Sequence, residues 1–331
     1  MHISVIGAGG WGTALGRLAV CQNHEVRLWA HEAEVVESIK ERRVNELFLP
    51  EVELPASLHV TNDIEEATRG AELLLTAVPS QHLRRVLANV TPYVAPDALL
   101  VSASKGIEEG TLLRMSEVIE QVMKERFEAR VIALSGPTFA REVAEDQPTA
   151  VVAASKHADL ARRVQEELSS LTFRAYANDD VVGVELGGAV KNVIAIAAGV
   201  CAGLGLGHNP LAALITRGLA EISRLSEALG GRGKTLAGLA GMGDLVLTCT
   251  GQLSRNRAVG YELGRGKPLA AILSSMRTVA EGVPTTHATV PLARRHGVEM
   301  PITFQMDRLL GGKTTPEEAM RELMSRRLRE E

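Results

Sequence analysis

The sequence predicts an α/β protein with a doubly wound parallel sheet in its N-terminal half and an all-helical C-terminal half. Three observations support this fold class. Up to about residue 178, short β-rich runs alternate with helical stretches, which is typical of a parallel sheet covered on both faces. A glycine-rich turn directly follows the first apolar run. Beyond Asn178 the strand signal fades and helical spacing takes over.

Eight short apolar runs are expected to form the strands of the sheet. They are His2–Ile6, Glu25–Trp29, Leu58–Thr61, Leu73–Val78, Leu99–Ser102, Val131–Ser135, Ala150–Ala154 and Phe173–Ala177. Helical stretches such as Thr13–Cys21 and Leu112–Phe127 lie between them. Because crossovers between parallel strands are right-handed, this alternation favours a doubly wound arrangement.

Residues 179–331 are predicted to form a separate helical domain. Val181–Gly199 is apolar and rich in Ala and Gly, and Leu211–Leu229 shows helical spacing. Thr315, followed by Pro316 and two glutamates, is typical of a capped helix start. The predicted domain boundary therefore lies between residues 178 and 179.

Composition and charge exclude several classes of function. The 331 residues include 36 Lys and Arg against 40 Asp and Glu, a net charge of −4. A broad nucleic-acid-binding surface needs a basic excess, so none is expected, although a small basic pocket is compatible with this charge. Three scattered cysteines without a CxxC pair predict neither disulfides nor a metal site. The N-terminus does not resemble a signal peptide, and Val193–Gly207 is too short for a membrane span, so a cytoplasmic protein is expected.

The first predicted strand runs into Gly7, Gly9 and Gly12, which match the GxGxxG pattern. The turn follows a strand and opens a helix, which is the context that this motif requires. Gly7 permits the tight turn, Gly9 allows a pyrophosphate to approach, and Gly12 allows helix and strand to pack closely. The helix start would also donate free N–H groups to phosphates. Residues 1–178 are therefore predicted to form a Rossmann-type dinucleotide-binding domain.

The end of the second predicted strand bears on the choice between NAD and NADP. An acid at this position binds the ribose 2′-hydroxyl of NAD and repels the 2′-phosphate of NADP. We place the position at Ala30, which carries no charge, beside His31, whose ring is able to approach a phosphate. NADP is therefore slightly favoured, while Glu32 keeps NAD as the alternative.

Two lysines lie in unusual surroundings. Lys105 follows the predicted strand Leu99–Ser102, at the end where open α/β sheets bind their ligands. Lys191 has apolar or glycine neighbours apart from Glu185 and Asn192. Burial would lower the pKa of its amine towards neutrality, which suits a proton donor to a developing alkoxide. The alternative for Lys105 is a solvated loop lysine, and the alternative for Lys191 is a side chain whose amine reaches water.

A third candidate feature follows Gly241-Met242-Gly243-Asp244 in the sequence. Ser254 is a good N-cap, and Arg255 and Asn256 then fall in the first helical turn, where backbone N–H groups are unpaired. Together these groups are able to bind a compact dianion such as a phosphate. The alternative is an ordinary capped helix with a surface arginine.

Seven stretches of the chain resemble the bacterial NAD(P)-dependent glycerol-3-phosphate dehydrogenase family. They are IGAGGWGTALG, VSASKGIEEGT, LSGPTFAREVA, ELGGAVKNVIAIAAG, ALITRGLAEISRL, LAGMGDLVLTCTGQLSRNRAVG and VAEGVPTT. They run in order from Gly7 to Thr286 and cover nearly the whole chain. The resemblance implies a homodimer that reversibly reduces dihydroxyacetone phosphate to sn-glycerol 3-phosphate with NAD(P)H. This product would feed glycerophospholipid biosynthesis.

The resemblance also implies roles for individual residues. Lys191 matches the proton donor and acceptor, while Lys105 and Asp244 match further catalytic groups. The implied substrate contacts are Lys105, Gly136, Thr138, Lys191, Asp244, Ser254, Arg255 and Asn256. Beside the three fingerprint glycines, the implied cofactor contacts are Gly10, Trp11, His31, Lys105, Ala140, Arg255, Val279 and Glu281. The family commonly has Ser where this chain has Gly10, so a hydroxyl contact to the diphosphate is lost while the backbone N–H remains.

Two other functions share parts of this pattern. A related two-domain β-hydroxyacid dehydrogenase would have the same fingerprint and lysine but a carboxylate substrate, whereas the Ser254–Asn256 turn favours a phosphate. A non-catalytic dinucleotide-sensing protein would lack the catalytic lysine, whereas Lys191 and Lys105 are both present.

Overall fold

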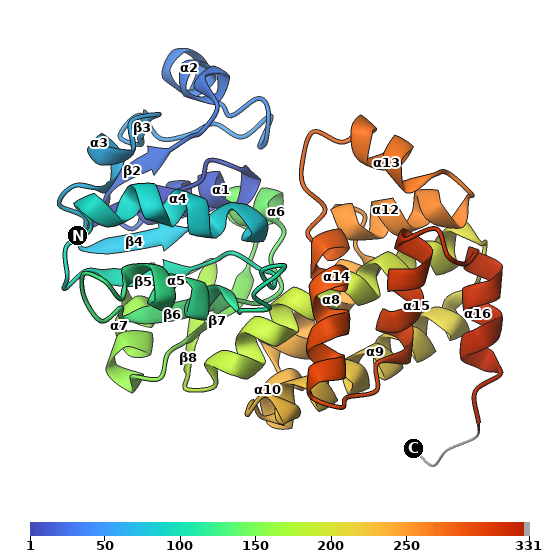
Figure 1. Ribbon diagram of the computed structural model, residues 1–331. Coiled ribbons are helices and arrows are strands. Elements are labelled where there is room, and N and C mark those ends of the chain that lie inside the picture. Colours follow the sequence, from blue (N-terminus) through green and yellow to red (C-terminus); the bar gives the residue numbers. More distant parts are fainter. Residues whose placement is uncertain (328–331) are drawn as a thin grey trace.

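The computed structural model describes residues 1–327, and within them a sheet flanked by helices packs against a group of helices (Figure 1). The sheet has eight strands in the order β3-β2-β1-β4-β5-β6-β7-β8. They are β1 (His2–Ile6), β2 (Glu25–Trp29), β3 (His59–Thr61), β4 (Leu73–Thr76), β5 (Leu99–Ser102), β6 (Val131–Ser135), β7 (Thr149–Ala154) and β8 (Phe173–Asn178). The order of the first six strands is that of a Rossmann-type sheet, and the predicted fold class is confirmed.

One strand pair departs from the predicted parallel sheet. Strands β6 and β7 are antiparallel, with Leu134 opposite Ala153. The chain forms the short helix α6 (Ala140–Ala144) after β6, and this helix packs against α1 (Gly10–Cys21). Strand β7 then starts at the end of the sheet where β6 finished and runs back. Since apolar runs look alike in either direction, the sequence pattern did not distinguish this pair from a parallel one.

Helices cover both faces of the sheet because its strands are apolar on both sides. In β4, Leu73 and Leu75 enter one core cluster, while Leu74 enters another on the opposite face. The further helices of this half are α2 (Ala33–Arg42), α3 (Ile64–Thr68), α4 (Leu83–Val90), α5 (Met115–Met123) and α7 (Ala158–Leu168), with 3₁₀ turns η1 (Ser80–His82) and η2 (Thr91–Tyr93). Helix α5 begins at Met115 and not at the predicted Leu112, because Leu112 has a positive φ angle, which does not fit a right-handed helix.

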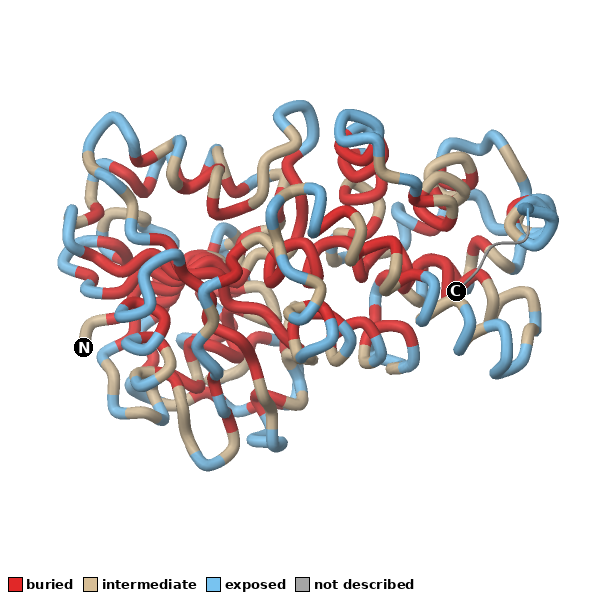
Figure 2. Tube along the Cα trace, turned by 90° about the horizontal axis from the view of Figure 1, so that it is seen from below, coloured by how far each residue is buried: buried red, intermediate tan, exposed pale blue. Residues whose placement is uncertain are grey.

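The helical half surrounds one central helix, α8 (Val181–Gly203). By length and composition this helix could cross a membrane, but 94% of its most apolar window is buried inside the fold. Figure 2 shows buried segments in the interior of both halves and exposed ones along the outside. Against α8 pack α9 (His208–Ala228), α10 (Gly233–Leu236), the π-helical turn η3 (Leu239–Gly243), α11 (Asp244–Thr250), α12 (Arg255–Gly264), α14 (Gly282–Arg295) and α15 (Pro301–Leu310). Helix α13 (Leu269–Ser275) packs against α12, and α16 (Pro316–Met324) packs against α15.

The strands end at Asn178 and the long helices begin at Val181, whereas the division into two domains at 178/179 stays a prediction. Residues 328–331 of the predicted helical domain lie outside the described residues. The predicted cap at Thr315 is confirmed, since its hydroxyl accepts a hydrogen bond from the Glu318 backbone N–H at 3.2 Å.

Helices α8 and α12 pack backbone against backbone. A Cβ atom at Gly199 would lie 2.0 Å from the carbonyl oxygen of Arg257, and one at Gly260 would lie 1.9 Å from that of Ile196. No residue other than glycine fits at either position without a backbone shift. This packing holds the N-terminus of α12 close to the middle of α8, where Lys191 lies.

Candidate functional site

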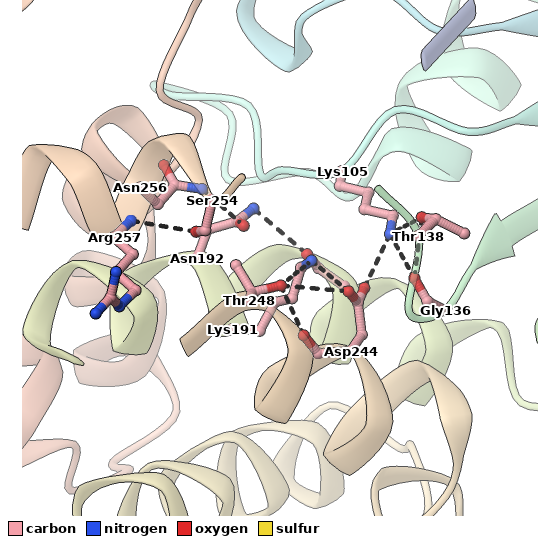
Figure 3. Close-up of polar contacts among 11 residues, drawn as sticks. Lys105, Gly136, Thr138, Lys191, Asn192, Asp244, Thr248, Ser254, Asn256 and Arg257 are labelled. Carbon is pink, nitrogen blue, oxygen red and sulfur yellow. Dashed lines mark hydrogen bonds and ion pairs between the residues drawn. The ribbon is translucent and has the colours of Figure 1, made fainter. Parts of the chain in front are cut away.

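Two lysines from the two halves of the chain share one buried carboxylate (Figure 3). Lys105, three residues beyond β5, donates a hydrogen bond from Nζ to Asp244 Oδ2 at 2.8 Å. Lys191, in α8, donates from Nζ to Asp244 Oδ1. Asp244 is the first residue of α11 and has no solvent-exposed surface. The structure thus brings three separately predicted residues together beside the carboxyl end of the sheet.

Further contacts fix the orientation of both amines. The Lys105 amine also donates to Gly136 O at 2.9 Å and to Thr138 Oγ1 at 3.3 Å. The Lys191 amine donates to Thr248 Oγ1 at 2.7 Å, and this hydroxyl donates to Asp244 O at 2.6 Å. Thr248 was not predicted from the sequence, although its position four residues after Asp244 places both on one side of α11.

Burial changes the proton affinity of Lys191. Desolvation lowers the pKa of its amine from 10.5 to about 8, Asp244 opposes this shift, and the positive charge of Lys105 adds to it. The direction agrees with the expectation from the apolar sequence around Lys191. An amine with a pKa of about 8 is able to donate a proton near neutral pH and to recover it from water. Burial also raises the pKa of the nearby Cys249 thiol to about 12, so this thiol stays protonated.

Arg255 presents a positive charge at the start of α12. The predicted N-cap is confirmed, since Ser254 Oγ accepts a hydrogen bond from the Arg257 backbone N–H at 3.2 Å. Within residues 1–327 the Arg255 side chain makes no hydrogen bond or ion pair, although the residue is exposed to solvent. Surrounding protein groups nevertheless lower the pKa of its guanidinium by desolvation, with Glu281 opposing the shift. An accessible but unpaired guanidinium next to a helix N-terminus is suited to bind an anion.

Asn256 connects the N-terminal end of α12 to the helix that carries Lys191. Its Nδ2 donates to Asn192 Oδ1 at 2.9 Å, and its Oδ1 accepts from the Gly282 backbone N–H at 2.9 Å. Asn192 directly follows Lys191 in α8. The two candidate groups, Lys191 and Arg255, therefore lie on helices joined by a buried hydrogen bond as well as by glycine packing.

Glu281 makes a contact between the two halves. Its carboxylate accepts hydrogen bonds from the Ser80 backbone N–H at 3.0 Å and from the Ser80 hydroxyl. Desolvation raises the pKa of Glu281, while these hydrogen bonds oppose the shift. Ser80 was not predicted, because nothing in the sequence around it indicates a contact 201 residues away. Val279, the other residue predicted in this segment, is 43% exposed.

The fingerprint glycines occupy positions that require their lack of a side chain. Gly7 has φ 109°, and a Cβ atom at Gly12 would lie 1.8 Å from Gly7 O. A Cβ atom at Gly9 would meet no atom within 4 Å, so the backbone there is open to a ligand. Gly9 is also the N-cap of α1 and provides no side-chain cap, which leaves the first N–H groups of the helix available.

Three other predicted cofactor residues gather around this turn. The indole N–H of Trp11 is buried without a partner among the described residues. A Cβ atom at Gly10 would lie 2.7 Å from Phe48 O and 3.6 Å from Ala140 Cβ, so Ala140 lies beside the fingerprint. A serine at position 10 would require the Phe48 carbonyl to move. An open glycine backbone, an uncapped helix start and an unpaired indole N–H fit a bound dinucleotide diphosphate.

The structure corrects the position chosen to discriminate between NAD and NADP. Ala30 is fully buried, and its backbone N–H donates to Thr61 O at 3.0 Å. An acid there would be buried without a partner instead of facing a ribose. His31, the next residue, is exposed beyond the carboxyl end of β2 and is the side chain able to meet a cofactor.

Cavity volume alone does not locate this site. A surface cavity of about 490 Å³ is lined by Leu18, Cys21, Leu171 and their neighbours, away from both lysines. Near the site, a cavity of about 10 Å³ lies between Lys105 and Glu185. We place the site by its paired charges, because the large cavity has no comparable cluster of titratable groups.

A Rossmann-type sheet with an open GxGxxG turn, joined to helices that present a buried lysine at its carboxyl edge, defines an NAD(P)-dependent dehydrogenase. Two family models match the chain. They are described as NAD-dependent glycerol-3-phosphate dehydrogenase N-terminus, over residues 2–161, and C-terminus, over residues 180–321. The chain belongs to the NAD-dependent glycerol-3-phosphate dehydrogenase family.

Individual relatives agree with this assignment. A glycerol-3-phosphate dehydrogenase (NAD(P)+) of Koribacter versatilis is 60% identical over 98% of this chain and 97% of its own length. A glycerol-3-phosphate dehydrogenase (NAD(P)+) of Citrifermentans bemidjiense is 55% identical over 99% of this chain and 98% of its own length. The crystal structure of glycerol-3-phosphate dehydrogenase from Coxiella burnetii matches with a TM-score of 0.93 and 39% identity, over 98% and 99% of the two chains. A ketopantoate reductase from Ralstonia eutropha, with a TM-score of 0.64 and 16% identity, shares the fold.

Proposed function

We propose that this chain catalyses the reversible reduction of dihydroxyacetone phosphate to sn-glycerol 3-phosphate with NADH or NADPH. The observation that carries the proposal is the arrangement of α8 and α12. One helix presents the Lys191 amine, with a pKa of about 8, and the other presents the Arg255 guanidinium, which has no partner within residues 1–327. A ketone that carries a phosphate needs both groups, a proton donor for its oxygen and a cation for its anionic end.

In the proposed complex, the phosphate of the substrate binds Arg255 and the first N–H groups of α12. Lys191 donates its proton to the carbonyl oxygen, so that an N–H bond breaks as the O–H bond of the alcohol forms. In the oxidative direction the neutral amine takes this proton back. Lys105 polarises the same carbonyl oxygen, while Asp244 orients both amines and favours the charged form of Lys191. The remaining residues proposed to line the substrate site are Gly136, Thr138, Ser254 and Asn256.

When bound, a nicotinamide cofactor would supply or accept the hydride at the carbonyl carbon. The residues proposed to hold it are Gly7, Gly9, Gly10, Trp11, Gly12, His31, Lys105, Ala140, Arg255, Val279 and Glu281. The uncapped start of α1 and the open backbone at Gly9 support a diphosphate at the fingerprint. The exposed position of His31 after β2 supports a contact with the adenosine ribose or its phosphate.

The proposal extends to the setting of the reaction. We propose that the protein works in the cytoplasm as a homodimer and supplies glycerol 3-phosphate for glycerophospholipid synthesis. Light scattering during size-exclusion chromatography is expected to give twice the mass of one chain.

Oxidation of NADPH or NADH on addition of dihydroxyacetone phosphate tests the activity. We expect cofactor oxidation in proportion to the ketone added, and none with a 2-keto acid such as ketopantoate as control. Turnover of the 2-keto acid alone would favour the β-hydroxyacid dehydrogenase alternative. Cofactor binding without turnover of either ketone would favour a dinucleotide-sensing protein.

A further inference from the structure

A second buried charge pair joins the two halves of the chain behind the lysine site. Glu185 of α8 accepts hydrogen bonds from Arg114 Nη1 at 2.6 Å, Ser116 Oγ at 2.6 Å and the Ser116 backbone N–H at 2.7 Å. The Arg114 and Glu185 side chains are only 12% and 6% exposed. Arg114 also pairs with Glu117, at 2.8 Å. Glu185 therefore caps the start of α5 from the opposite half of the molecule.

This pair fixes the end of the segment that carries Lys105. The segment, residues 103–114, connects β5 to α5. Its start is held by the sheet, since the Ala103 backbone N–H donates to Thr76 O at 2.8 Å. Within it, Ile107 forms an antiparallel bridge with Arg114. A shift of Arg114 would therefore also move Ile107, which lies two residues from Lys105 in the sequence.

Helix α8 also contacts the Lys105 side chain itself. Gly188 lies three residues after Glu185, on the same side of the helix, and Lys191 follows three residues later. A Cβ atom at Gly188 would lie 3.7 Å from Lys105 Cδ, so the stem of Lys105 runs along α8 at this point. One helix therefore holds the segment of Lys105, contacts its stem and carries the second amine, Lys191.

Stability alone gives little reason to keep a charge pair at this depth. Removing two charges from water costs free energy that their attraction often fails to recover, and apolar replacements of buried pairs are frequently as stable. Desolvation raises the pKa of Glu185, which reflects this cost, although Arg114 and Ser116 act to lower the pKa. A role in fixing the position of a segment gives a reason for the pair.

We propose that Glu185 is a positioning residue for Lys105: through Arg114 and Ser116 it holds residues 103–114 against α8, so that the Lys105 amine meets Asp244 and the substrate carbonyl. This inference rests on the proposed function, because it gives Lys105 a part in the reaction. Glu185 itself contacts neither substrate nor cofactor in this arrangement.

The test compares Glu185→Gln in two backgrounds, the wild-type chain and Lys105→Met. Displacement of a positioned group by about 1 Å is able to cost up to ~100-fold in rate, so we expect kcat for dihydroxyacetone phosphate to fall roughly 10- to 100-fold in the wild-type background. In Lys105→Met the same change should lower kcat less than about twofold, because changes that act through one group are not additive. A purely structural role would lower kcat equally in both backgrounds.

Glu221→Gln is the matched control. Glu221 of α9 is also buried and caps another helix, accepting from the Ile302 and Thr303 backbone N–H groups at 2.6 and 3.1 Å. It lies outside the lysine site, so its variant should lose stability while kcat stays within about twofold of wild type. If Glu185→Gln does not fold, Arg114→Gln/Glu185→Gln removes both buried charges and carries the same comparison.

Two outcomes would overturn the inference: an unchanged kcat in Glu185→Gln, or an equal loss in the Lys105→Met background. Either would leave the proposed function intact, provided that the wild-type chain oxidises NAD(P)H with dihydroxyacetone phosphate. Failure of the wild-type reaction would refute the proposed function instead.

Discussion

Replacing Lys191 by methionine tests whether the buried amine serves the reaction or the fold. Methionine keeps a flexible apolar side chain of similar length, with sulfur in place of one methylene, and removes the amine. The pKa of Lys191 is about 8 in the folded protein, against 10.5 for an ordinary lysine. At 1.36 kcal/mol for each pH unit, the folded protein bears a cost of roughly 3 kcal/mol for keeping this amine charged at pH 7.

The variant should therefore be at least as stable as the wild-type protein at pH 7. Asp244 loses one partner but keeps Lys105 at 2.8 Å, which limits the gain to less than the full 3 kcal/mol or so. Between about pH 8 and 10.5 the folded wild-type lysine holds fewer protons than the unfolded one, so wild-type stability should rise with pH across this window. Lys191→Met should lack this rise, as measured by urea denaturation at pH 7 and at the upper end of the window.

Activity should change in the opposite direction. Loss of a general acid typically costs about 10²- to 10⁴-fold, so kcat for ketone reduction should fall by that factor in the cofactor-oxidation assay. Lys156→Met, at a lysine side chain that is 65% exposed, is the control and should leave kcat and stability near wild type. A Lys191→Met enzyme with kcat within about tenfold of wild type would refute the role of proton donor. A large fall in stability with unchanged kcat would make Lys191 a structural residue.

Three further predictions concern the phosphate, pH and the cofactor. Arg255→Ala should raise KM for dihydroxyacetone phosphate roughly 10- to 100-fold, since a hydrogen bond to a charged group contributes about 1.5–3 kcal/mol. The control variant Arg257→Ala should leave this KM unchanged. An unchanged KM in Arg255→Ala would contradict the phosphate site. The rate of ketone reduction should fall as pH rises through about 8, where Lys191 loses its proton. The rate of alcohol oxidation should rise over the same range. Rates that do not change in this way would argue against Lys191 as the proton donor and acceptor. His31→Asp should shift the kcat/KM ratio from NADPH towards NADH, because an exposed acid repels a 2′-phosphate, and a constant ratio would show that recognition lies elsewhere.

The sequence was sufficient to predict the strands of the sheet because each is a short apolar run that ends at a turn. It did not predict the reversal at β7, which depends on where α6 packs and not on the composition of the strand. Helix ends were less certain for a similar reason. The positive φ angle of Leu112 shortens α5, and this backbone conformation depends on the surrounding fold.

Candidate residues were easier to predict from the sequence than their contacts. Lys105, Lys191 and Asp244 were each identified, but nothing in the chain indicates that one carboxylate pairs with amines 139 and 53 residues away. The position of Ala30 was misjudged because the pattern does not show which residue after β2 turns its side chain to solvent. A lone acid in an apolar stretch was the available signal for Glu185, and its partner Arg114 was not predicted.

The backbone contact between α8 and α12 limits which molecules fit the proposed site. Since Gly199 and Gly260 leave no room for adjustment and Asn192 bonds Asn256, the backbone positions of Lys191 and Arg255 are held by a rigid pair of helices. We therefore expect the enzyme to favour a phosphate one carbon removed from the ketone over homologues with a longer spacer, because the two helices cannot move apart to accommodate the extra length.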